Sequence, residues 1–169
     1  MKRFIVLLAL VMLPNPASAE FRGALVTKLR GDDQPVATSF YVSHYARTTF
    51  SKIEYDTDLF FDPEKPDTLT IPAGVERVKL QCQIIFEQNT AGHRQAVITK
   101  DKSFFPGFTA ENKPAIAGTT TDLNISTPVL MVKAGDTFQC NAWQTQESPD
   151  APAINIKGSN GVWFSIEVK

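Results

Sequence analysis

Two histidines, His44 and His93, are the first side chains to consider for catalysis in this chain of 169 residues. Nucleophilic hydrolases need a base within hydrogen-bonding reach of a serine or cysteine, and histidine most often supplies it. Neither histidine flanks a Gly-x-Ser-x-Gly motif, and none occurs in the sequence. Both lie in short polar segments typical of loops, without the cysteine or carboxylate neighbours of a zinc site. We therefore expect no enzyme and no cofactor.

Three aspartates, Asp56, Asp58 and Asp62, lie within seven residues and are the candidates for a metal site. The spacing of the first two resembles the start of a calcium-binding loop, but Phe61 stands where its glycine belongs and Asp67 where its bidentate glutamate belongs. An acid and base for glycoside hydrolysis could come from the same residues, although nothing singles out a pair. The alternative is a turn whose aspartates accept hydrogen bonds from their own backbone. On balance the pattern predicts no metal.

Aromatic rings are the third candidate set. Trp143 and Trp163 alternate with the apolar residues of their segments, so both rings should point away from the main core. Such rings can be buried against a second copy of the chain, can line a sugar-binding groove, or can pack under loops of the same subunit. The candidate ligand-binding residues are Trp143, Trp163, Phe60 and Phe61, and the further rings of the set are Phe104, Phe105 and Phe108.

The two cysteines, Cys82 and Cys140, each alternate in phase with apolar neighbours, so both thiols should point into the core. An oxidising compartment would permit them to pair. The bridge would close a loop of roughly sixty residues, worth about 4 kcal/mol in the chain-entropy model. Two buried free thiols acting as small hydrophobes are the alternative. We favour the disulfide.

Residues 1–19 indicate a cleaved signal peptide. Lys2 and Arg3 precede an apolar run over 4–13, and small residues at 17–19 suit a signal peptidase. The run is shorter than the roughly 20 residues that a membrane-spanning helix needs, and a retained anchor is the alternative. We expect export to the periplasm, cell surface or medium, with no membrane span after cleavage. Loss of the two leader cations shifts the net charge from −1 to −3, which argues against nucleic-acid binding.

The elements that must position these residues are β-strands. Alternation of apolar and polar residues recurs about every ten residues between turn signals such as Pro72-Ala73-Gly74, whereas helical periodicity is almost absent. This pattern predicts an all-β, antiparallel sandwich or barrel, with one domain over residues 20–169. The ten expected strands are residues 23–29, 38–42, 48–50, 67–71, 77–86, 94–100, 120–130, 137–144, 153–157 and 162–168.

Several segments, taken in order, carry a family resemblance. They are Tyr55-Asp56-Thr57-Asp58-Leu59-Phe60-Phe61-Asp62, Leu69-Thr70-Ile71-Pro72-Ala73-Gly74-Val75, Arg77-Val78-Lys79-Leu80, Gly92-His93-Arg94-Gln95, the run 128–138, Trp143-Gln144 and Trp163-Phe164-Ser165-Ile166-Glu167. Across roughly residues 36–169 the chain resembles bacterial and phage-associated members of the superfamily of the complement q-subcomponent globular head and tumour necrosis factor (TNF). The two cysteines and the signal peptide depart from that pattern.

The resemblance implies a jelly roll of two antiparallel sheets that commonly assembles as a trimer and serves recognition rather than catalysis. The sequence therefore predicts an exported recognition or structural protein that binds a glycan or a cell-surface protein as a homotrimer. A carbohydrate-binding protein that uses exposed aromatic rings is the alternative. A glycoside hydrolase is a remote third option, because no acid, base or nucleophile set stands out.

Overall fold

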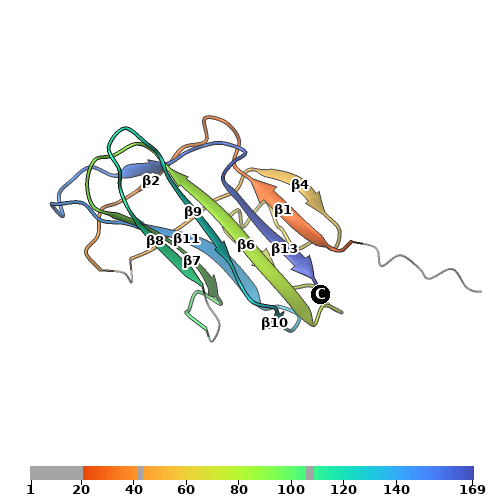
Figure 1. Cartoon of the computed structure of the whole chain (residues 1–169). Coiled ribbons are helices and arrows are strands. Elements are labelled where there is room, and N and C mark those ends of the chain that lie inside the picture. The colour runs from red at the N-terminus through yellow and green to blue at the C-terminus, as the bar shows by residue number, and fades with distance from the viewer. Residues whose placement is uncertain (1–20, 42–43, 106–108) are drawn as a thin grey trace, which may run out of the picture.

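Two β-sheets packed face to face make up the protein, as Figure 1 shows for the computed structural model, which describes residues 21–41, 44–105 and 109–169. The strands β9, β6, β13, β1 and β4 lie in one layer, and β8, β7 and β11 lie in the other. The predicted signal peptide and Phe108 lie outside the described residues. Over the described ranges, no helix is long and apolar enough to cross a membrane.

The larger sheet has eight strands, and β6 is its longest. β6 pairs antiparallel with β13, β9, β10 and β12; β13 pairs with β1, and β1 pairs with β4. β2 joins this sheet through β12. The bounds are β1 Gly23–Thr27, β2 Gln34–Val36, β4 Lys52–Asp56, β6 Arg77–Phe86, β9 Thr121–Ser126, β10 Leu130–Met131, β12 Ile154–Ile156 and β13 Trp163–Val168.

The smaller sheet has five strands and is organised around β11. β11 pairs antiparallel with β7, β3 and β5, and β8 pairs with the other partner strand, β7. The bounds are β3 Ala46–Arg47, β5 Leu69–Thr70, β7 His93–Lys100, β8 Ala110–Pro114 and β11 Thr137–Gln144.

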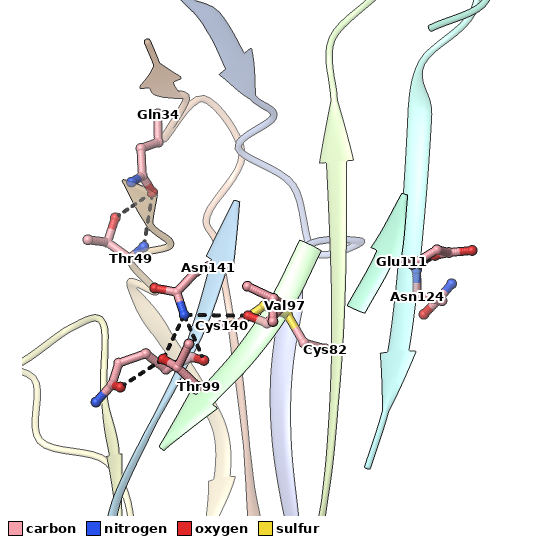
Figure 2. Close-up of a disulfide and its surroundings, with 10 residues drawn as sticks. Gln34, Thr49, Cys82, Val97, Thr99, Glu111, Asn124, Cys140 and Asn141 are labelled. Carbon is pink, nitrogen blue, oxygen red and sulfur yellow. Dashed lines mark hydrogen bonds between the residues drawn. A yellow bond between two sulfur atoms is a disulfide. The ribbon is translucent and has the colours of Figure 1, made fainter. Parts of the chain in front are cut away.

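The core between the sheets is apolar and contains a disulfide between Cys82 on β6 and Cys140 on β11 (Figure 2). Both cysteines are fully buried, and their Cα atoms are 6.4 Å apart. The bond therefore joins the central strands of the two layers, and the predicted pairing is confirmed. Its apolar neighbours follow from alternation along each strand, which sends every second side chain inward.

Side chains also join the sheets along the β8 and β9 edge. The Asn124 backbone N–H on β9 donates to the carboxylate of Glu111 on β8, both labelled in Figure 2. Nearby, Lys113 Nζ on β8 donates to the Asp122 carbonyl on β9, with 2.7 Å between nitrogen and oxygen. These contacts hold an edge strand that buries little apolar surface.

The predicted all-β, antiparallel fold is confirmed, but the described ranges contain thirteen strands rather than about ten. Residues 120–130 divide into β9 and β10, and residues 48–50 connect β3 to β4 instead of forming a strand. In the expected strand 38–42, Thr38 makes only an isolated bridge to Gln144. β2, β3, β4 and β8 were missed because they are polar, short or at a sheet edge, where backbone pairing rather than apolar alternation defines the strand.

Candidate functional site

One candidate surface is the outward face of the eight-stranded sheet around Trp163, called here the tryptophan face. Alternation in β13 sends Phe164 and Ile166 into the core and turns Trp163 outward, as the sequence predicts. Around that ring lies a shallow hollow of about 490 Å³. It is lined by Leu25, Thr27, Glu54, Tyr55, Gln81, Asn160, Trp163 and Ser165.

Tyr55 completes the apolar part of the tryptophan face from the edge strand β4. Its ring packs edge-on against Phe21, with 5.4 Å between ring centroids. Burial raises the pKa of the Tyr55 phenol, and the nearby charge of Glu167 adds to the rise, so the hydroxyl stays neutral at physiological pH. This face thus presents aromatic and aliphatic surface surrounded by uncharged and acidic groups.

The outward face of the five-stranded sheet is built differently, with three buried polar side chains bonded to one another: Thr99 on β7 and Gln139 and Asn141 on β11. Asn141 Nδ2 donates to Thr99 Oγ1 at 2.9 Å and to the carbonyls of Val97 and Gln139. Thr99 Oγ1 in turn donates to Gln139 Oε1 at 3.2 Å. The buried amides therefore have defined orientations, which lowers the cost of removing them from water.

Above this network lies a second hollow, of about 550 Å³, called here the polar hollow. Thr99 and Asn141 form part of its floor, and Ser103 adds a hydroxyl. Figure 2 shows the Asn141 amide nitrogen turned toward Val97 and Thr99 and its oxygen turned away from them. The remaining lining residues are two aromatic and two cationic side chains: Tyr45, Phe104, Arg47 and Lys102.

The aromatic rings of the polar hollow are fixed to each other. Tyr45 and Phe104 pack edge-on, with 5.9 Å between ring centroids. Tyr45 donates its hydroxyl hydrogen to Gln95 Oε1 at 2.7 Å. Burial raises the pKa of Tyr45, so the phenol remains a neutral donor near pH 7. The hydrogen bond to Gln95 on β7 therefore keeps the Tyr45 ring beside Phe104.

A tight turn brings Lys102 to the polar hollow. Lys100 and Ser103 exchange two backbone hydrogen bonds, of 3.0 and 2.8 Å, around Asp101 and Lys102. These two residues have φ values of 49° and 65°, the left-handed combination that hairpin turns usually reserve for asparagine and glycine. Asp101 Oδ1 accepts from the Thr137 backbone N–H at 2.9 Å, and the Lys102 N–H donates to Gln139 Oε1 at 3.2 Å. The turn is thus anchored to the strand that carries Asn141.

Three of the four predicted ligand-binding rings lie inside the protein. Phe60 and Phe61 are only 1% and 7% exposed and belong to the apolar core. Trp143 is 6% exposed, and among the described residues its indole Nε1 meets no hydrogen-bond acceptor. Trp163 lines the hollow of the tryptophan face, and Phe61 reaches the wall of a separate hollow beside Pro63 and Pro66. Packing within the subunit therefore accounts for the other three.

The three metal candidates, Asp56, Asp58 and Asp62, bind backbone N–H groups or an arginine side chain. Asp56 accepts from the backbone N–H groups of Phe60 and Phe61 at 3.0 and 2.9 Å. Asp58 forms an ion pair with Arg22 at 2.7 Å, which holds the pKa of its carboxyl below the usual range. Asp62 Oδ1 accepts from a backbone N–H two residues on. The predicted turn is confirmed, and within the described ranges no three His, Cys, Asp or Glu side chains are grouped to hold a metal.

The histidines lie apart from both hollows. His44 Nδ1 is 3.2 Å from Ser39 Oγ, but that hydroxyl also bonds to both the N–H and the carbonyl of Tyr41, which makes it part of a local turn. His93 Nδ1 lies 3.3 Å from Asn112 Oδ1 on the paired strand β8. Both side chains are exposed, but only His44 lies outside a strand; His93, predicted in a loop, is the first residue of β7.

Sequence reasoning missed the polar hollow, because its residues come from separate places in the chain. The only signal was Thr137, Gln139 and Asn141, a polar set on alternate positions of one strand. Such a set usually indicates a solvent-facing side. Here two of its members are buried, which requires hydrogen-bond partners and marks the face as more than a solvated surface.

The arrangement of the two sheets is a TNF-like jelly roll, as comparison with solved structures shows. Murine APRIL at pH 5.0 matches with a TM-score of 0.59 at 8% identity, over 88% of this chain and 100% of that one. Murine APRIL at pH 8.5 gives 0.54 at 10% identity, over 88% and 100%. Eiger TNF from S. frugiperda gives 0.52 at 10% identity, over 88% and 92%. No protein-family model and no curated protein matches the sequence.

Proposed function

We propose that this protein is an exported, non-enzymatic recognition protein that works as a homotrimer and binds a glycan or a protein ligand. One observation carries the proposal: a TNF-like jelly roll presents an open hollow centred on Trp163 on the outward face of its larger sheet. The sequence resemblance implies this fold, and proteins of the superfamily that it names commonly form trimers. The tryptophan face is the surface we assign to assembly.

The chemistry of the tryptophan face suits contact with a second copy of the chain. Trp163, Tyr55 and Leu25 supply apolar area, and Gln81 and Ser165 supply neutral polar groups. The carboxylate that also lines the hollow, Glu54, is paired with Lys52 at 2.8 Å. Protein interfaces concentrate aromatic residues at the centre and exclude charge from it. Tyr55 is 37% exposed in one chain, so a partner has ring surface left to cover.

Export is supported by the disulfide and by the predicted leader. Cys82 and Cys140 are joined, and such bonds persist in oxidising compartments. A non-enzymatic role is supported by the positions of the groups that could have done chemistry. The cysteines form a disulfide, Asp56 accepts hydrogen bonds from backbone N–H groups, and Asp58 forms an ion pair with Arg22.

Light scattering on the secreted protein after size-exclusion chromatography tests the assembly. We expect a particle of three times the chain mass, and Trp163→Glu should convert it to a folded monomer by placing a charge in the interface. Phe104→Glu is the matched control, because it adds the same charge to an exposed ring between β7 and β8, on the side of the other sheet, and should leave the trimer intact. A monodisperse wild-type monomer would refute the proposal.

A further inference from the structure

We propose that the polar hollow binds an acidic saccharide, with one sugar ring against Phe104, its carboxylate on Lys102 and Arg47, and a hydroxyl group on Asn141. This inference rests on the proposed function, because it assigns a ligand class to a recognition protein. The hollow, at about 550 Å³, is within the usual size range of small-ligand sites. It lies on the sheet opposite the tryptophan face, so assembly and ligand binding can use separate surfaces.

Asn141 gives the polar hollow an oriented hydrogen-bond acceptor. The side chain is 4% exposed, and its amide nitrogen is held by Thr99, Val97 and Gln139. Those contacts decide which end of the amide faces outward. Within the described part of the chain, Asn141 Oδ1 accepts no hydrogen bond, and the residue lines the hollow. A ligand hydroxyl group would satisfy that oxygen without any side-chain rearrangement.

The charge lining the polar hollow is positive. Lys102 and Arg47 are its charged residues, and both are exposed. One Arg47 nitrogen contacts Asp67 Oδ2 at 3.2 Å, which orients the guanidinium and leaves other N–H groups for an anion. Lys102 is held by a turn in a left-handed conformation that a lysine adopts only at a cost. Backbone strain of this kind is often kept where it positions a group for binding.

The rings distinguish a saccharide from a simple anion. Phosphate or sulfate would need only the cations, whereas this hollow also offers Phe104, which is 52% exposed and braced edge-on by Tyr45. A sugar has both an apolar C–H face for an aromatic ring and hydroxyl groups for Asn141 and Ser103. A carboxylate on the sugar accounts for the two cations. Acidic saccharides therefore use every type of group that lines the hollow.

A ligand-observed NMR titration tests the site with sodium glucuronate, galacturonate and N-acetylneuraminate, each compared with its uncharged methyl ester as the neutral counterpart. We expect at least one acidic sugar to bind more tightly than its neutral counterpart. Removing one charge-assisted contact should weaken that binding about tenfold, equivalent to about 1.4 kcal/mol. The inference is overturned if none of the acidic sugars binds, or if neutral sugars bind equally well.

Lys102→Gly is the most informative variant. Glycine adopts positive φ without strain, so the fold should keep or raise its melting temperature while the ammonium is lost. Weaker binding by a protein that is at least as stable excludes misfolding as the cause. Lys157→Gln removes an exposed lysine outside the hollow and should bind like the wild type. Equal losses in both variants would show that only net charge matters and would overturn the assigned site.

Light scattering on the same samples separates this inference from the proposed function. A trimer that binds no acidic sugar would overturn the saccharide site and leave assembly supported. A monomer that binds acidic sugars with the expected loss in Lys102→Gly would support the site and refute the trimer. Tris-acetate and sodium phosphate titrations complete the test, because equal competition by simple anions would assign the hollow to anions in general and overturn the saccharide claim.

Discussion

The outward faces of the two sheets differ in the environment of their polar side chains. On β6, Gln81 and Gln83 alternate with core residues and keep contact with solvent. On β11, Gln139 and Asn141 alternate in the same way, yet both are buried, and Gln139 accepts a hydrogen bond from the Lys102 backbone N–H in the turn next to it. Similar sequence patterns therefore produce an open aromatic face on one sheet and a hydrogen-bonded network under a hollow on the other.

Alternation therefore predicts which side of a strand faces the core, but it does not predict what covers the other side. A polar side chain that stays wet needs no partner, whereas a buried one must be bonded within the protein. Within a single chain, the eight-stranded sheet should therefore tolerate changes of its outward polar residues with little loss of stability. The five-stranded sheet should lose stability when its outward amides are altered, and this contrast can be measured.

Removal of the bond that joins the two sheets should have the largest effect. The double variant Cys82→Ala/Cys140→Ala should lower the free energy of unfolding by about 4 kcal/mol, because the unfolded chain regains the freedom of a long loop. Urea unfolding followed by tryptophan fluorescence measures it. Since the bond joins β6 to β11, both faces should lose structure in one transition. If the fluorescence change splits into two transitions at different urea concentrations, the two sheets do not unfold as one cooperative unit.

The contrast between the faces is tested directly by Asn141→Ala and Gln81→Ala, each made in the Trp163→Glu background, in which no partner should cover the tryptophan face. The first should cost about 2 kcal/mol, because it leaves the acceptors bonded by Asn141 Nδ2 without that donor. The second changes an exposed residue and should stay within about 0.5 kcal/mol. Urea midpoints of the two variants, at matched slopes, give the comparison. Equal losses would mean that the two outward faces are energetically alike.

Acid should distinguish an ion pair at the end of the five-stranded sheet from one beside the tryptophan face. Burial would raise the pKa of Asp136, but hydrogen bonds from Lys100 Nζ, at 2.6 Å, and from the Lys133 N–H outweigh it and leave that pKa lowered. The charged carboxylate therefore stabilises the fold at neutral pH, and this contribution is lost as the pH falls below about 4 and through the lowered folded-state pKa.

Asp136→Asn should thus cost about 2 kcal/mol at pH 7 and show a flatter fall in stability on acidification than the wild type. Asp58→Asn is the control, since the Arg22–Asp58 pair also has a lowered carboxyl pKa but remains partly in water. Its effect at pH 7 should be the smaller one. Urea midpoints of the wild type and both variants, measured from pH 7 to pH 3, provide the test. The prediction is wrong if Asp58→Asn flattens the acid-induced fall in stability more than Asp136→Asn does.

How far the sequence predicts this molecule depends on how local each signal is. Long alternating runs gave β6 and β11 with their observed bounds, and the same alternation placed both cysteines in the core. The polar hollow has no such signal, because it needs β3, β7, β11 and the turn at Asp101 and Lys102 together. That turn has neither asparagine nor glycine at its centre. Neighbouring strands, through backbone pairing, decide its shape.

The smallest expected effect concerns two buried threonines, one with a hydrogen-bonded hydroxyl and one without. Thr48 is fully buried, and its Oγ1 has no hydrogen-bond partner among the described residues, whereas Thr99 Oγ1 bonds to Gln139 and Asn141. Replacing each with the similarly shaped valine should therefore have opposite signs. Thr48→Val should raise the free energy of unfolding by about 1 kcal/mol, and Thr99→Val should lower it by about the same amount. Thermal and urea unfolding of both variants provide the measurement; a loss at both positions would show that the Thr48 hydroxyl is bonded in solution and that burial alone does not identify the network.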